Sequence, residues 1–238
     1  MKKKILIIFF LTLIPLYLIY RFNHKETYIY LAIGDELAKG HTPFNTYGES
    51  YTDYLFTYLK TKNTNAEINK KYIDEDMRIT DLIKSLKNIE ENSLTQDIKK
   101  SDIITISIGS EEIFNKLKTN YTIYKTNPTL FNKYIDTLFI NLTELLKEMT
   151  KYTNKPIYII GYYSPIEITE ENATLIKSMF NYIDLKFKEL ENKYNIKYIN
   201  IYEGFKNNKT YIPNINHTFP SLEGYNYISN EIIKKLES

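Results

Sequence analysis

Three short polar stretches of this chain lie next to a predicted strand or helix and contain carboxylate, hydroxyl or imidazole side chains that could take part in chemistry. Asp35 and Glu36 follow the apolar segment YIYLAI, and the turn 109–112 (GSEE) follows DIITISI. A third polar stretch, 216–220 (NHTFP), precedes the last predicted helix. Carboxylates can act as general acids or bases or bind cations, and a serine beside a base can act as a nucleophile. The chemistry therefore depends on which of these side chains the fold brings together.

Histidine and cysteine, the side chains that most often bind transition metals, are scarce in this chain. The chain has no cysteine and only three histidines, His24, His41 and His217. The lack of cysteine excludes disulfides, Cys-based zinc sites and a Cys nucleophile. Three scattered histidines do not indicate a transition-metal site, so we expect no metal and no cofactor. A net charge of +2 gives no reason to expect a nucleic-acid partner.

The body of the chain alternates between short β-branched segments and longer segments with helical periodicity. Five segments are predicted to be strands: 28–33, 66–73, 102–108, 156–162 and 196–201. Apolar residues recur at helical spacing in 51–59, 79–89, 131–149, 176–190 and 225–236. Thr169, followed by two glutamates, is expected to cap the fourth of these helices. This alternation predicts a parallel sheet with helices on both faces, and its ligand crevice at the carboxyl ends of the strands.

The three polar stretches resemble, in order and spacing, the motifs of the SGNH, or GDSL, hydrolases. Gly34-Asp35-Glu36-Leu37 matches Gly-Asp-Ser-Leu, 109–112 matches Gly-x-Asn-Asp, and 216–225 matches Asp-x-x-His-Pro before a Gly-Tyr helix. The resemblance extends over residues 28–238. It implies a flavodoxin-like three-layer αβα sandwich with a five-stranded parallel sheet of order 2-1-3-4-5.

The same resemblance implies ester hydrolysis by a serine, a histidine base and an aspartate, with an asparagine in the oxyanion hole. In this chain Glu36 stands at the serine position and Glu111 at the asparagine position. An ionised glutamate has no hydroxyl to attack with, and it accepts hydrogen bonds where asparagine donates them. A stretch of bulky residues that includes Arg78 occupies the region of the family's second glycine motif.

The last motif can be aligned in two registers. Alignment on Pro220 puts Phe219 at the base position and Asn216 at the aspartate position. A shift of two residues makes His217 the base and Asn214 the replacement for aspartate. Neither register restores a complete triad.

Three readings of the substituted site remain open at this stage. In the first, Glu36 is structural: it accepts backbone N–H groups at a helix N-terminus and pairs with Arg78 or Lys39. In the second, carboxylates and tyrosines bind a ligand such as a glycan without catalysis. In the third, the carboxylates share a proton or hold a hard cation. The side chains expected to line the pocket are Asp35, Arg78, Ser110, Glu112, Asn216 and Phe219.

His41 and three serines next to predicted strands and helices are the remaining candidates. The loop of His41 either lines the crevice or forms an ordinary turn, and the turn is favoured. Ser50, Ser107 and Ser110 are interpreted as turn or cap residues, with Ser110 facing the crevice as the alternative. The stretch 162–165 (YYSP) follows the fourth strand and either lines the pocket or packs on a helix.

The first 25 residues have the composition of a membrane signal anchor. Three lysines precede an apolar run, 5–20, and Arg21 and Lys25 follow it. A helix of this run is about 24 Å long, slightly short of a bilayer core of about 30 Å. No small-x-small cleavage site follows, so we expect an uncleaved single-pass anchor with the domain 26–238 outside the cytoplasm.

The sequence as a whole therefore predicts a membrane-anchored, extracytoplasmic, SGNH-like protein. Because its catalytic positions are substituted, we expect it to bind or scaffold a ligand, with a glycan or a lipid as candidates. The alternative is an active esterase or acetylesterase that uses Glu36, Glu111 or His217 in a non-standard way.

Overall fold

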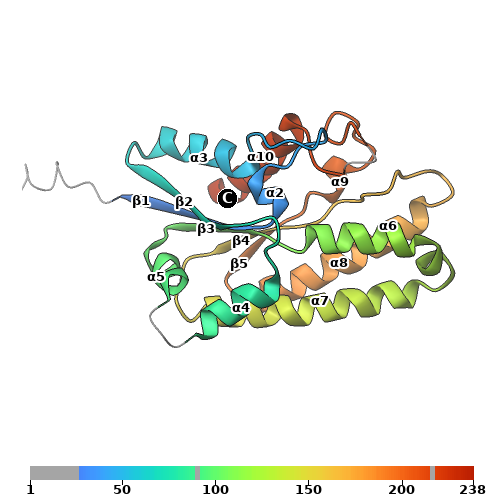
Figure 1. The fold of residues 1–238 in the computed structure, drawn as a ribbon, viewed down its shortest axis with the longest axis horizontal. Helices are drawn as coiled ribbons and strands as arrows, with labels where there is room; N and C mark the ends of the chain where they lie inside the picture. Colours follow the sequence, from blue (N-terminus) through green and yellow to red (C-terminus); the bar gives the residue numbers. More distant parts are fainter. Residues whose placement is uncertain (1–26, 89–91, 215–217) are drawn as a thin grey trace, which may run out of the picture.

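The computed structural model describes residues 27–88, 92–214 and 218–238. Its centre is a five-stranded parallel sheet in the order β2-β1-β3-β4-β5 (Figure 1). The strands are β1 (Tyr28–Gly34), β2 (Ala66–Ile73), β3 (Ile103–Ser107), β4 (Ile157–Ile160) and β5 (Ile196–Ile199). The expected number of strands, their parallel pairing and their order are confirmed.

The strands are buried in the way their sequences predict. Every residue of β3 and β4 is buried, because helices cover both faces of a parallel sheet. The hydroxyl groups of Tyr30 and Thr105 lie 2.7 Å apart in the interior, so the two polar groups in the central strands satisfy one another. The edge strand β2 is only half-buried and contains Lys70 and Lys71. Charged side chains on an edge strand disfavour its pairing with a strand of another molecule.

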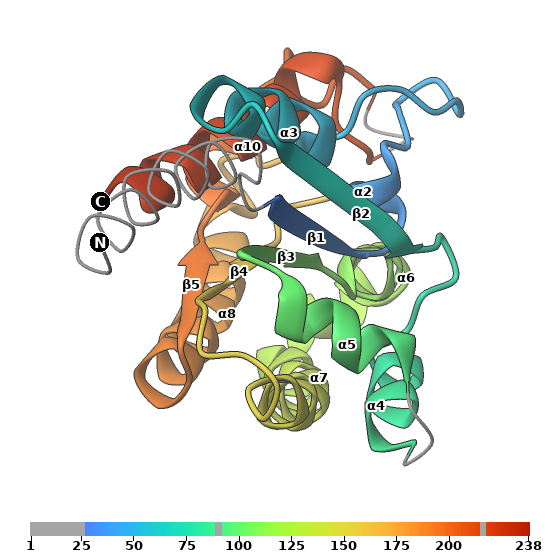
Figure 2. The same ribbon diagram turned by 90° about the vertical axis from the view of Figure 1, so that its left-hand side faces the viewer.

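Two helical layers enclose the sheet (Figure 2). One layer contains α2 (Glu36–Lys39), α3 (Tyr51–Lys62) and α10 (Leu222–Glu237). The other contains α4 (Ile79–Lys87), α5 (Ser93–Lys100), α6 (Ser110–Thr126), α7 (Pro128–Met149) and α8 (Ala173–Lys193). A short α9 (Tyr202–Phe205) follows β5. The three-layer αβα arrangement is therefore confirmed.

Three local predictions differ from the structure. Helix α8 begins at Ala173 after Asn172, and Thr169 forms only the turn before it, accepting a hydrogen bond from the amide of Ala173. Helices α5 and α6 were not expected from the apolar spacing. Helix α5 is short and buries only Leu94, Thr95 and Ile98. Helix α6 begins at Ser110, inside the polar turn 109–112.

The predicted anchor, 5–20, lies outside the described residues. Among the helices that the structure describes, none is long and apolar enough to cross a membrane. The anchor therefore stays a prediction.

The carboxyl ends of β1 and β3 approach each other closely, and this contact sets the geometry of the site. A Cβ atom on Gly34 would lie 2.3 Å from the carbonyl oxygen of Ser107, so glycine is required there. The amide of Asp35 donates to that same carbonyl at 2.9 Å. Gly109, at φ 83°, then turns the chain into α6.

Candidate functional site

Asp35 lies at the centre of the carboxyl edge of the sheet, buried with 3% of its surface exposed. One carboxylate oxygen accepts from the amide of Leu37 at 3.2 Å and so caps α2. The other accepts from the amide and the hydroxyl of Ser110, at 3.2 Å and 2.7 Å. Burial raises the pKa of Asp35 to about 6, although these hydrogen bonds favour the charged form. Asp35 therefore joins the first turns of α2 and α6.

Glu36 is the first residue of α2, and its side chain is held in a confined position. One oxygen lies 3.8 Å from Nδ1 of His41, and the side chain is 16% exposed. The other oxygen is buried and has no hydrogen-bond partner among the described residues. Burial, and then the negative charges of Glu111 and Asp35, raise the pKa of Glu36 to about 7. The carboxyl group is therefore partly protonated near neutral pH.

The structural interpretation of Glu36 is wrong in its details. Asp35, rather than Glu36, accepts the backbone N–H at the start of α2. Lys39 pairs with Glu75 at 3.1 Å, and the side chain that lies beside the carboxyl group of Glu36 is the imidazole of His41. The expected pairing of Glu36 with Arg78 or Lys39 does not form.

His41 lies at the site, although the sequence favoured an ordinary turn over a loop that lines the crevice. Its ring packs against Phe219, with the ring centres 4.2 Å apart, and stacks on Tyr47 at 5.1 Å. Its carbonyl oxygen accepts a hydrogen bond from Tyr225 of α10 at 2.7 Å. The left-handed Gly40 at the end of α2 was the one local signal, because it reverses the chain and returns His41 to Glu36.

Phe219 is the part of the last motif that the structure places at the site. Asn216 and His217 lie outside the described residues, so the choice between His217 and Phe219 as the residue at the base position stays a prediction. Asn214 lies nearby, with its side-chain amide 3.4 Å from the carbonyl oxygen of Pro43. We refer to Asp35, Glu36, His41, Glu111 and Phe219 as the carboxyl-edge site.

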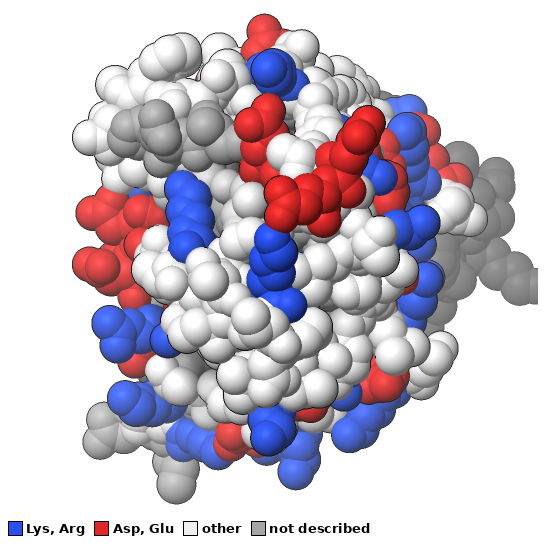
Figure 3. Space-filling view, turned by 90° about the vertical axis from the view of Figure 1, so that its right-hand side faces the viewer, with Lys and Arg blue, Asp and Glu red and all other residues white. Residues whose placement is uncertain are grey.

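A cavity of about 160 Å³ lies beside this site and has an acidic rim. Its charged lining residues are Asp35, Glu75, Asp76, Arg78, Glu111 and Glu112. Figure 3 shows acidic side chains gathered on this face of the molecule. Of the side chains expected in the pocket, Asp35, Arg78 and Glu112 line this cavity, and Ser110 and Phe219 do not. No group of three His, Asp or Glu side chains in the described ranges is arranged to hold a metal ion.

The serines near the site are engaged in structural contacts. Ser110 is 4% exposed and donates to Asp35. Ser107 accepts a hydrogen bond from Tyr51, and Ser50 caps α3. Ser50 is a cap as expected, whereas Ser107 ends β3 and Ser110 is the first residue of α6, with its hydroxyl on the carboxylate of Asp35.

Comparison with known proteins identifies the family. The sequence model of the GDSL-like lipase/acylhydrolase family matches residues 30–232. This chain belongs to that family. The resemblance seen in the motifs is thereby confirmed. No curated protein matches the sequence significantly.

Solved structures of the SGNH hydrolase fold are similar over most of the chain. The lipase Lip_vut3 from a goat rumen metagenome superposes with a TM-score of 0.70 at 17% identity, covering 87% of this chain and 97% of its own. A catalytic mutant of Axe2, an acetylxylan esterase from Geobacillus stearothermophilus, gives 0.64 at 16% identity, with 90% and 97% covered. A lipase/acylhydrolase from Enterococcus faecalis gives 0.58 at 14% identity, with 89% and 96% covered. At these identities the likeness shows the fold.

Because the pKa of Glu36 is raised, we expect the difference in stability between the Glu36→Gln variant and the parent protein to depend on pH. The folded protein holds the Glu36 proton up to about pH 7, whereas an unfolded glutamate releases it near 4.5. The Glu36 contribution to stability therefore falls as the pH rises between these values. We expect Glu36→Gln to melt at a higher temperature than the parent above pH 7, and at nearly the same temperature at pH 4.

Thermal melts of both proteins between pH 4 and pH 8 measure this difference. Glu112→Gln, which removes an exposed carboxylate from α6, is the matched control and should show no such trend. A constant difference between Glu36→Gln and the parent at all pH values would contradict the prediction.

Proposed function

We propose that this protein binds an acylated glycan at the carboxyl-edge site and does not hydrolyse esters by the serine mechanism of its family. The observation that carries the proposal is the position of Glu36. It is the first residue of α2, directly after Asp35, the N-cap residue that follows β1, where the family's motif has its serine. A carboxylate there offers no hydroxyl and repels a developing oxyanion.

The solved structures with the same fold support the comparison of Glu36 with the serine of the family motif. The Axe2 acetylxylan esterase is represented by catalytic mutants of a serine, an aspartate and a histidine. In this chain Glu36 takes the place of the serine and Glu111 that of the oxyanion asparagine. A glutamate at either place works against ester hydrolysis.

The site nevertheless has the groups that recognise a sugar. The rings of Tyr47, His41 and Phe219 pack in a row beside Glu36, and Tyr47 is 52% exposed. Aromatic faces suit the C–H faces of a sugar ring, and the carboxylates accept hydrogen bonds from its hydroxyls. Phe44, 73% exposed on the same loop, adds apolar surface for an acyl substituent.

An active ester hydrolase is the second candidate, because the family and its solved neighbours are esterases and lipases. Turnover of short-chain nitrophenyl esters distinguishes the two. We expect the full-length protein to show no turnover above a heat-inactivated sample. Glu36→Ser should also remain inactive, because the asparagine of the oxyanion hole is still replaced by Glu111. Clear turnover that is lost in His217→Ala would establish the second candidate.

Binding itself is tested with an acetylated xylo-oligosaccharide titrated against the protein by calorimetry. We expect Tyr47→Ala to weaken binding about tenfold, because it removes the exposed ring of the aromatic row. Tyr58→Ala is a matched control, because the hydroxyl of Tyr58 also donates to a glutamate and its ring also faces a lysine. Equal binding by the parent and Tyr47→Ala would contradict the proposed site.

We also propose that residues 5–20 anchor the protein in the cytoplasmic membrane with the folded domain outside. Strand β1 begins at Tyr28, and the carboxyl-edge site lies at its other end, about 20 Å away. Only seven residues, 21–27, separate the apolar run from β1, so an anchored domain would direct its site away from the membrane. This arrangement favours a glycan over a lipid of the same membrane.

Fractionation of cells tests the anchor. The full chain should remain with the membrane after alkaline carbonate washing and leave it in detergent, and a C-terminal tag should be digested when protease is added to cells stripped of their wall. A cytoplasmic protein tagged in the same way is the control and should be protected. Release of the full chain by carbonate, or protection of its tag, would contradict the anchor or its orientation.

A further inference from the structure

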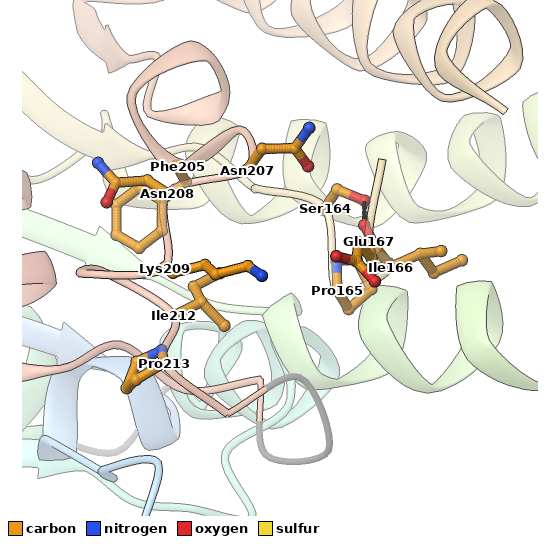
Figure 4. Close-up of a pocket in the computed structure, with 10 residues that line it drawn as sticks. All are labelled: Ser164, Pro165, Ile166, Glu167, Phe205, Asn207, Asn208, Lys209, Ile212 and Pro213. Carbon is orange, nitrogen blue, oxygen red and sulfur yellow. Dashed lines mark hydrogen bonds between the residues drawn. The ribbon is translucent and has the colours of Figure 1, made fainter. Parts of the chain in front are cut away.

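A second cavity, of about 400 Å³, lies on the carboxyl side of β4 and β5. It opens between the loop that follows β4, which contributes Ser164 to Glu167, and the segment after α9, which contributes Asn207 to Pro213 (Figure 4). None of its lining residues belongs to the carboxyl-edge site. A cavity of this size has room for a small ligand.

The two walls of the cavity are fixed to one another. Asn207 adopts a left-handed conformation, with φ 53°. Its side chain accepts from the amide of Ile168 at 3.1 Å and donates to the carbonyl oxygen of the same residue at 2.9 Å. On the opposite wall the hydroxyl of Ser164 holds a tight turn with Ile166. The cavity is therefore formed before any ligand arrives.

Apolar side chains make up half of the lining of the cavity. Phe205 lies at the bottom, 3% exposed, and its ring is stacked on Tyr163 with the centres 4.5 Å apart. Pro165 and Ile166 line one wall and Ile212 the other. An occupant of this cavity therefore needs an apolar body.

Two opposite charges face the cavity from its two walls. Figure 4 shows the ammonium group of Lys209 and the carboxylate of Glu167 directed toward the space between the loops. Within the described residues neither group takes part in an ion pair. Both charges are exposed and available to a ligand.

The opposite charges and the buried ring of Phe205 disfavour a phosphate or a sugar as the ligand of this cavity. A phosphate would meet a single lysine and the opposing carboxylate of Glu167, which repels it. A sugar would find no exposed ring to stack on, because Phe205 is buried. The amide of Asn208 is also occupied, since it accepts from the amides of Thr210 and Tyr211 and donates to the carbonyl oxygen of Gly204.

We propose that this cavity binds a short peptide with free ends, its ammonium on Glu167, its carboxylate on Lys209 and an apolar side chain against the partly exposed Ile166 and Ile212. A single amino acid carries both charges on neighbouring atoms, whereas two residues separate them by about 7 Å. The two separated charges of a dipeptide therefore match the two charged side chains on opposite walls. The proposal does not depend on glycan binding at the carboxyl-edge site.

The dipeptide alanyl-leucine, titrated against isotopically labelled full-length protein in detergent, tests the proposal by NMR. We expect saturable shifts centred on the amides of Glu167, Lys209 and Ile212. Glu167→Gln and Lys209→Gln should each weaken binding about fivefold. Alanyl-leucine with an acetylated N-terminus and an amidated C-terminus carries no charge. It should bind the unaltered protein about as weakly as free alanyl-leucine binds the variant that combines Glu167→Gln and Lys209→Gln.

The matched controls are Glu170→Gln and Lys206→Gln, which remove exposed charges from the same two loops without lining the cavity. They should leave the affinity unchanged. Exchange of the two charges, by Glu167→Lys together with Lys209→Glu, should restore binding above that of either single variant, because the peptide can then bind in the reverse direction.

Two results would overturn the proposal. One is the absence of shifts at roughly 20 mM dipeptide, far above the range of a specific site. The other is equal binding of the free and the blocked peptide, which would show that the apolar floor alone determines affinity.

Discussion

The buried carboxylate of Asp35 is the interaction on which the arrangement of the carboxyl edge depends. It joins the end of β1 to the first turns of α2 and α6 through three hydrogen bonds, from Leu37 and from Ser110. A carboxylate of this depth is costly to bury, and each of these donors offsets part of the cost. The position of Glu36 follows from it, because Glu36 is the next residue in the chain and has no freedom to leave the site.

The carboxyl edge of the sheet is electrostatically negative around Glu36. Glu36, Glu111, Glu75 and Asp76 bring negative charge to one region, and no described cation neutralises Glu36 itself. The molecule accommodates this by a raised pKa on Glu36 and by placing the imidazole of His41 beside it. These charges are consistent with the proposed binding of a neutral, hydroxyl-rich ligand, because negative charge opposes the formation of an oxyanion.

The sequence was sufficient for the sheet and insufficient for the site. Five apolar segments and three ordered motifs predicted the strand number, and the family resemblance supplied their order, because burial on both faces leaves a strong signal in a parallel strand. The rule that strand ends meet at one edge also predicted that Glu36 and Glu111, which follow neighbouring strands, lie near one another. His41 could not be found in this way. It reaches Glu36 through the left-handed Gly40 and packs on Phe219, which lies 178 positions further along the chain. The pairing of Lys39 with Glu75 was equally hidden, since Glu75 belongs to the loop after β2.

The last helix has a consequence for how the protein can be handled. Helix α10 starts beside the site, where Tyr225 contacts His41, and ends where Glu237 meets Tyr58 and Lys62 at the far end of α3. Tyr28 pairs with Ala66 at that same edge of the sheet. Both ends of the folded domain therefore lie opposite the site. A fusion partner, a surface tether or a fluorophore attached at either end leaves both cavities open to solution.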